Sequence, residues 1–168
     1  MNRGTPQAVL VAAFLLVAGT AMLAVRGHER TLAEGSVVLA ALAPVDPRSL
    51  MQGDYMALRF AIDDELPQRP GEASGRTDPL PIFVYLALDG EGRASLAGFG
   101  DSLTPPVAGQ VAMRIHWRGG RPSIGPNAYF FQEGTAERFA AARWGEFRVS
   151  ARGTALLTQL RDANLERL

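Results

Sequence analysis

The sequence predicts a mainly β protein: an antiparallel β-sheet domain, either a sandwich or a partly open barrel, with one or two short helices and a single N-terminal transmembrane helix. Two observations support this fold class. An uncharged apolar run opens the chain, and later segments alternate apolar and polar residues between clusters of turn-forming residues. We therefore expect a membrane anchor with its flanks at residues 1–30 and one β-rich domain at residues 31–168.

The predicted anchor runs from Ala8 to Val25 and contains no charged residue. As a helix it would extend about 27 Å, close to the roughly 30 Å of a hydrocarbon core, so we expect it to contact the lipid bilayer directly. A cleaved signal peptide is the alternative, although the candidate cleavage site Ala18-Gly19-Thr20 is imperfect and the run is long for such a peptide. Arginines flank both ends, so the charge pattern does not set the orientation.

Period-two alternation predicts the strands of the domain. The clearest case is 111–118, where apolar residues at odd positions alternate with small or polar ones. Turn residues at 89–92 and 152–153 predict hairpins. In chain order, we expect strands at 36–43, 55–62, 82–88, 94–99, 111–118, 128–131, 147–151 and 154–160.

The remaining segments are predicted as connections and one helix. Residues 31–35 form a linker, and the proline-rich residues 66–81 form a loop. Residues 135–143 predict a helix, with Thr135 placed to cap it and Gly145 placed to end it. The last residues, 161–168, either continue as a short helix or fray.

Composition excludes several classes of site. The chain has no cysteine, which excludes disulfides, thiolate metal sites and lipoprotein anchoring. It also has no lysine, which excludes a Ser–Lys dyad, a Schiff base and a P-loop. Beyond Arg26, 15 arginines are set against 17 carboxylates, a net charge of −2, without any basic stripe. We therefore expect no nucleic-acid partner.

The usual catalytic and metal-binding sets are also incomplete. Only two histidines are present: His28 beside the anchor, and His116 between Arg114 and Arg118, whose charge should lower the pKa of His116. No G-x-S-x-G motif supplies a nucleophile, and the acidic residues 63–65 lack the ligand spacing of a calcium loop. The sequence therefore predicts no catalytic histidine, no metal site and no cofactor.

The most informative stretch of the domain is 45–62. Asp46, Pro47 and Arg48 have the chemistry of a turn, and Gly53 with Asp54 predicts a tight corner. Tyr55 then begins a half-buried strand, in which the residues at 56, 58, 60 and 62 form the apolar face.

The segment Gly53-Asp54-Tyr55-Met56-Ala57-Leu58-Arg59-Phe60 resembles the motif that names the GDYXXLXY protein family of bacteria, with Phe60 in place of the family's last tyrosine. Val45-Asp46-Pro47-Arg48 and Phe130-Phe131-Gln132-Glu133-Gly134 also resemble family segments. The resemblance implies a membrane-tethered envelope protein of the bacterial cytoplasmic (inner) membrane, single-pass, with its C-terminal domain on the outer, periplasmic side. It implies no mechanism.

The candidate site combines Asp46, Arg48, Asp54, Tyr55 and Glu133. Its carboxylates could perform general acid–base work if burial separated their pKa values. Alternatively, the aspartates brace two corners, Arg48 pairs with one of them and Glu133 caps the following helix. The full set of motif residues with a candidate role is Asp46, Pro47, Arg48, Gly53, Asp54, Tyr55, Leu58, Phe60, Phe131, Glu133 and Gly134.

The preferred hypothesis is a non-catalytic binding or accessory module for an integral membrane protein. The alternatives are a carboxylate-dependent hydrolase that uses Asp54 and Glu133, and a small-ligand sensor with a pocket between Tyr55, Phe60, Trp117 and Phe130. We also expect the corner at 46–55 to lie beside the segment 130–134, and only one of Phe130 and Phe131 to enter the core, because neighbouring residues of a strand face opposite ways.

Overall fold

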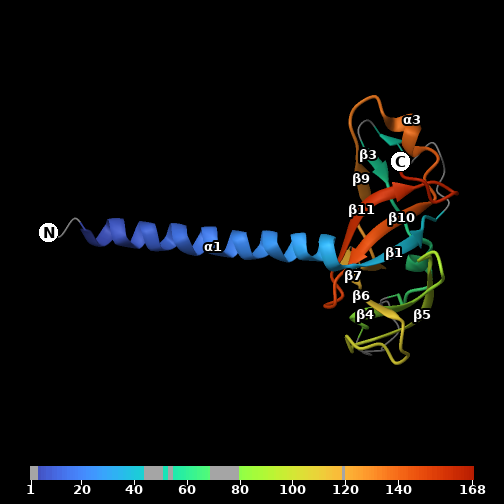
Figure 1. Cartoon of the computed structure of the whole chain (residues 1–168), viewed down its shortest axis with the longest axis horizontal. Helices are drawn as coiled ribbons and strands as arrows, with labels where there is room; N and C mark the ends of the chain where they lie inside the picture. Colours follow the sequence, from blue (N-terminus) through green and yellow to red (C-terminus); the bar gives the residue numbers. More distant parts are fainter. Residues whose placement is uncertain (1–3, 44–50, 53–54, 69–79, 119) are drawn as a thin grey trace.

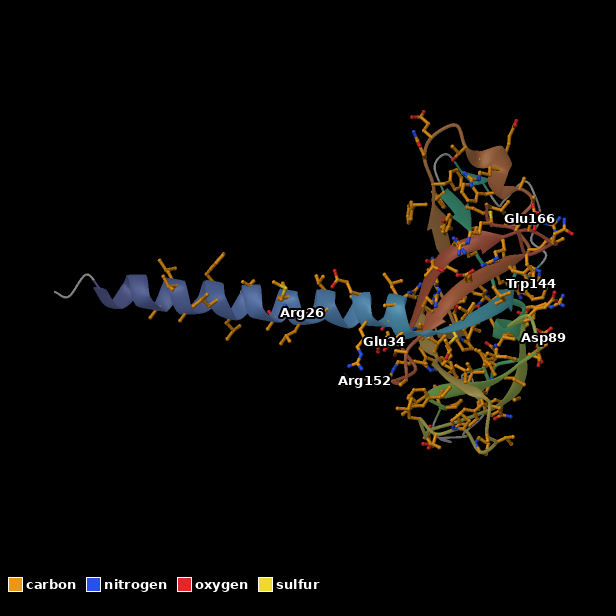
Figure 2. All side chains as sticks on the ribbon, in the orientation of Figure 1. Arg26, Glu34, Asp89, Trp144, Arg152 and Glu166 are labelled. Carbon is orange, nitrogen blue, oxygen red and sulfur yellow. The ribbon has the colours of Figure 1, made fainter. Side chains whose placement is uncertain are left out.

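The computed structural model describes residues 4–43, 51–52, 55–68, 80–118 and 120–168. A long helix, α1 (Gly4–Glu34), extends away from a β-rich domain whose strands spread across the helix axis at its C-terminal end (Figure 1). Its side chains project freely along most of its length (Figure 2). The stretch Val9–Glu34 is long and apolar enough to cross a membrane.

Helix α1 continues further than the sequence predicts. We expected a linker at 31–35, but the helix ends only at Glu34. The buried Thr31 lies in this extra turn, and its hydroxyl donates to the carbonyl of Gly27 at 3.0 Å. The amide of Gly35 then donates to the carbonyl of Thr31 at 2.9 Å, and the first strand starts at the next residue.

The first sheet places the two ends of the domain sequence side by side. Its antiparallel order is β1 (Ser36–Ala41), β10 (Trp144–Val149) and β11 (Ala155–Arg161). The predicted hairpin at 152–153 joins β10 and β11, and Gly153 has the positive φ of 75° that such a turn favours. Helix α1 leads directly into β1, so this sheet connects the helix to the domain core.

A second antiparallel sheet has the order β5 (Ala94–Gly100), β4 (Phe83–Leu88) and β6 (Val111–Arg114). The predicted β4–β5 hairpin is confirmed, and a carboxylate oxygen of Asp89 accepts the amides of Glu91 and Arg93 at 2.9 Å. The amide of Leu39 donates to the carbonyl of Gly92 at 2.8 Å, which ties this hairpin to β1.

The motif strand lies in a third small sheet, with the order β2 (Met51–Gln52), β3 (Tyr55–Ala57) and β9 (Ala128–Phe130). A further hairpin pairs β7 (His116–Arg118) with β8 (Arg121–Ser123). The predicted mainly antiparallel β class, with a long apolar N-terminal helix and a short helix in the domain, is confirmed for the described residues, and these sheets do not close into a barrel.

Two predicted strands are interrupted. The strand expected at 55–62 ends at Ala57, and the 3₁₀ helix η1 (Ala61–Asp64) replaces its second half. The strand expected at 111–118 divides at Ile115: β6 pairs with β4, and the amide of Ile115 still donates to the carbonyl of Ile82 at 2.9 Å in the same register, whereas β7 pairs with β8. The alternation is nevertheless real, since Met56, Leu58, Phe60 and Ile62 are all buried.

The predicted helix and C-terminus also differ from the structure. The helix expected at 135–143 is reduced to α3 (Ala136–Phe139), in which Thr135 makes no side-chain capping bond. Residues 161–168 form no helix. Asp162 accepts the amides of Asn164 and Glu166 at 2.9 Å, and Leu165 adopts a positive φ of 66°, so the chain folds back.

Phe60 and Phe147 form the centre of the core. Both rings are fully buried, with centroids 5.2 Å apart. Two glycines provide the space for them: a Cβ at Gly125 would lie 2.5 Å from Phe60 and 2.7 Å from Phe147, and one at Gly145 would lie 2.9 Å from Phe60. The motif segment is therefore fastened to the first sheet at Phe60, through an aromatic contact that only glycine backbone permits.

Candidate functional site

The half-buried motif residue Tyr55 forms an aromatic pair with an exposed residue on the neighbouring strand. Tyr55 on β3 lies opposite Phe130 on β9, with ring centroids 5.8 Å apart and planes inclined by 44°. Phe130 is 76% exposed, more than any other large apolar side chain in the described residues. We call Tyr55 and Phe130 the aromatic pair. The predicted contact between the corner and the 130–134 segment is thus confirmed at Tyr55.

The opposite face of β9 packs inward. Phe131 stacks on Phe139 of α3 with centroids 5.0 Å apart, and Tyr129 contacts the same ring at 5.4 Å. Phe131 packs against the core, whereas Phe130 is exposed, so the expectation that only one of them enters the core is confirmed. Because the neighbours of Phe130 are anchored, the exposed ring stands on a supported strand rather than on a free loop.

The other predicted site residues take separate positions. Leu58 and Phe60 are buried in the core, so the family's final aromatic position is occupied here by a packing residue. Glu133 is exposed, and Gly134 has a positive φ of 81° in the turn before α3. Asp46, Pro47, Arg48, Gly53 and Asp54 lie outside the described residues. The sensor pocket proposed for Tyr55, Phe60, Trp117 and Phe130 would need one shared cavity, yet Phe60 is enclosed while Phe130 faces solvent.

A polar pocket of about 660 Å³ lies beyond the other end of β3, with Leu58 and Arg59 in its lining. There, a carboxylate oxygen of Asp63 accepts the amide of Ile124 at 2.8 Å, and its other oxygen accepts the hydroxyl of Ser123 at 2.9 Å. Burial raises the pKa of Asp63, and these hydrogen bonds partly oppose the rise. Asp63 therefore holds η1 against the end of β8.

His116 behaves as the sequence predicts. Its ring is exposed on β7, and its pKa lies below the ordinary value because of partial desolvation and the positive charges of Arg118 and Arg114. Among the described residues, no carboxylate is hydrogen-bonded or ion-paired to His116. This environment provides no support for a catalytic role.

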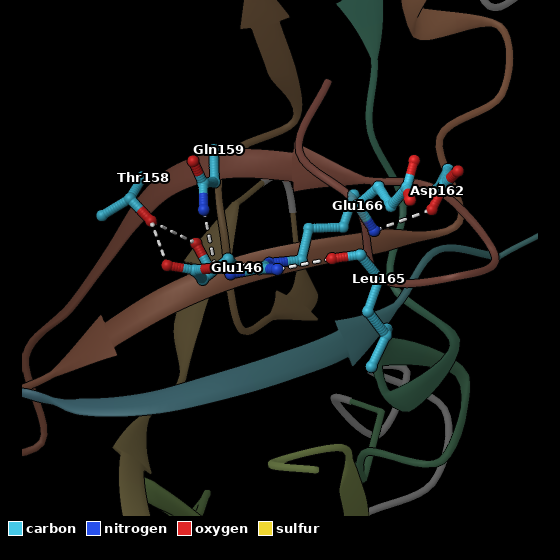
Figure 3. A network of polar contacts seen from close by, with 7 residues as sticks. Glu146, Thr158, Gln159, Asp162, Leu165 and Glu166 are labelled. Atoms are coloured by element: carbon cyan, nitrogen blue, oxygen red, sulfur yellow. Dashed lines mark hydrogen bonds and ion pairs between the residues drawn. The ribbon is translucent and has the colours of Figure 1, made fainter.

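A buried ionic network that sequence analysis missed lies between β10 and β11 (Figure 3). Glu146 is only 3% exposed, and its carboxylate accepts the side-chain amide of Gln159 at 2.7 Å and the Nε of Arg161 at 2.5 Å. A second guanidinium nitrogen of Arg161 pairs with the same oxygen, and another donates to the carbonyl of Leu165. The network thus fastens the C-terminal turn to the first sheet.

The charge state of Glu146 follows from these partners. Burial alone would raise its pKa, but the hydrogen bonds from Gln159 and Arg161 and the charges of Arg161 and Arg167 outweigh burial and lower the pKa. The sequence does contain a signal for this network, because Glu146 interrupts the otherwise apolar start of the strand 144–149. The carboxylate of Glu146 already accepts hydrogen bonds from Gln159 and Arg161, so we interpret Glu146 as a structural residue rather than an acid–base group.

The described residues contain no group of three or more His, Cys, Asp or Glu side chains that could hold a metal ion.

Comparison with known proteins gives one match. The model of the family described as GDYXXLXY protein matches residues 17–160, which is most of the chain and includes the motif, the aromatic pair and Glu146, but ends before Arg161. Neither a curated protein nor a solved structure matches.

Proposed function

The chain belongs to the GDYXXLXY protein family, and on that premise we propose that it is a membrane-anchored, non-catalytic module that binds an integral membrane protein through the aromatic pair. The observation that carries this proposal is the 76% exposure of Phe130 beside Tyr55, on a strand that the core holds in place. Aromatic side chains with supported neighbours are the residues that most often dominate protein interfaces.

The proposed location follows from α1. We propose that residues 1–30 anchor the chain in the bacterial inner membrane and that residues 31–168 form a domain on its periplasmic side. The length and composition of α1 support a membrane span. A tether of this kind keeps the domain within reach of other membrane proteins, which raises the effective concentration of even a weak contact.

The anchor is tested by alkaline carbonate extraction of membranes that contain the full chain. We expect the protein to remain in the pellet. Release of a shortened species that begins near Ala21 would show a cleaved signal peptide, and the tethered module would then have to be abandoned.

The partner surface is tested by placing a photo-crosslinking phenylalanine analogue at Phe130, with Phe99 as the matched control. Phe99 lies on β5 and is also exposed, at 49%. We expect crosslinks to one integral membrane protein from position 130 and not from position 99. Equal crosslinking at both positions would mean that no specific surface exists at the aromatic pair.

A substitution measures the strength of the contact. Phe130→Ala removes an exposed ring, so folding should be unchanged while capture of the crosslinked partner falls roughly tenfold or more, as at an interface hot spot. Phe99→Ala should leave capture unchanged. Undiminished capture by a folded Phe130→Ala protein would refute the role of the aromatic pair.

A further inference from the structure

A pocket of about 700 Å³ lies where the last turns of α1 meet the β10–β11 hairpin. The hairpin reaches back beside the end of the helix (Figure 1), and Glu34 and Arg152 lie close together there (Figure 2). Three arginines line this pocket: Arg26 and Arg30 from α1, and Arg152 from the hairpin. We call it the junction pocket.

The junction pocket has an excess of positive charge. Arg30 pairs with Glu34 at 2.7 Å, and Glu34 is the only acidic residue in the lining. Arg26 and Arg152 form no ion pair with any described residue. Its three arginines and one glutamate give the lining a formal charge of +2. Such a pocket favours an anionic occupant, and guanidinium groups match phosphate geometry well.

The depth of the pocket identifies the source of that anion. Arg26 directly follows the apolar run, and Arg30 lies about 6 Å further along the helix at 1.5 Å per residue. Bilayers of about 40–45 Å have a hydrocarbon core of about 30 Å, which leaves roughly 5–8 Å of headgroup layer on each side. Both arginines therefore fall at headgroup depth when α1 spans a membrane.

The other wall of the pocket is apolar and could contact the acyl chains of a lipid. Leu23 and Ala24 line it on the side toward the anchor, next to the arginines. A lipid phosphate at Arg26 and Arg152 would leave its acyl chains against this apolar surface. Free phosphate has no apolar part that could contact Leu23.

We propose that the junction pocket binds the phosphate of an anionic phospholipid headgroup, held by Arg26 and Arg152. This proposal rests on the proposed membrane anchor. The bound headgroup joins the helix end to the hairpin, so it would fix the tilt of the domain relative to the membrane surface.

The test uses the full chain in detergent micelles, titrated with phosphatidylglycerol or with phosphatidylcholine of the same acyl chains, and native mass spectrometry to count bound lipid. We expect selective retention of phosphatidylglycerol. Arg26→Gln and Arg152→Gln should each weaken it about fivefold, the effect of one arginine near an anionic surface. Arg138→Gln, an exposed arginine on α3, is the matched control and should change nothing.

The results separate the possibilities. Equal retention of both lipids, or normal retention by both pocket variants, would overturn the proposal. Displacement of phosphatidylglycerol by millimolar inorganic phosphate would overturn the lipid assignment and identify a soluble anion site. Arg26 lies on an exposed helix face, so its variant remains informative if Arg152→Gln does not fold. Carbonate extraction reports on the anchor separately, since loss of the chain from the pellet would refute the anchor whatever lipid the micelles retain.

Discussion

Replacement of Gly125 by alanine tests whether the motif residue Phe60 is held by close packing. The new methyl group would lie 2.5 Å from Cε2 of Phe60 and 2.7 Å from Cζ of Phe147. Ordinary contacts between carbon atoms are about 3.5–4.0 Å, so the rings would have to move by roughly 1 Å. Neither can do so freely, because both are fully buried and pack on each other.

The expected cost of Gly125→Ala follows from two opposing terms. Overpacking of a dense core costs about 1–3 kcal/mol, and a clash with two rings belongs at the upper end of that range. Alanine also restricts the unfolded chain more than glycine does, which stabilises the folded state by about 0.4–1 kcal/mol. We therefore expect the free energy of unfolding to fall by about 2 kcal/mol.

Urea titration of the full chain in micelles, followed by tryptophan fluorescence, provides the measurement. Trp117 and Trp144 are the only tryptophans, and both belong to the β-rich domain, so the signal reports on the domain and not on α1. Gly90→Ala is the matched control, because no atom lies within 4 Å of a Cβ at Gly90. We expect it to be neutral or slightly stabilising.

A double substitution identifies the clashing ring. With Phe60→Leu in place, Gly125→Ala should cost about 1 kcal/mol less than it does alone, because the closest contact has been removed. Equal effects of Gly125→Ala and Gly90→Ala, or strict additivity with Phe60→Leu, would refute this account of the core.

Three further predictions concern buried charge and the helix junction. Glu146→Gln should lower stability by about 3 kcal/mol at pH 7, because it leaves an arginine facing a neutral group. The pKa of Glu146 is lowered in the folded state, so its stabilisation is present above the ordinary value of 4.5 and is lost as the pH falls below it. The pKa of Asp63 is raised, so its effect has the opposite sign: stability falls as the pH rises from the ordinary value of 3.8, and Asp63→Asn should remove that slope. Gly35→Ala should cost about 2 kcal/mol, since its Cβ would lie 2.4 Å from the carbonyl oxygen of Thr31, whereas Gly27→Ala has no such neighbour.

The same urea titrations, repeated between pH 7 and about pH 2, check these predictions. A difference between Glu146→Gln and the parent that stays constant down to the lowest pH would show that the carboxylate does not need its charge. Unchanged pH dependence in Asp63→Asn would show that another group causes the slope. Equal stability of Gly35→Ala and Gly27→Ala would mean that the junction tolerates a side chain.

The sequence by itself determined the features that depend on neighbouring residues. Absence of charge from Ala8 to Val25 predicted the long apolar helix, and alternation predicted which face of 55–62 is buried. The turns at 89–92 and 152–153 were predicted because turn residues act over a few positions. The motif residues also indicated the family correctly.

Only the tertiary structure decided how distant segments use those elements. The segment predicted as one strand at 111–118 divides because only β6 pairs with β4, whereas β7 pairs with β8, and Asp63 accepts the amide of Ile124, 61 positions along the chain. Glu146 is paired only because β11 places Gln159 opposite it and brings Arg161 within hydrogen-bond distance, and the junction pocket exists only where Arg152 meets the end of α1. Each of these features is a contact between residues far apart in the chain, whose partners local periodicity does not specify.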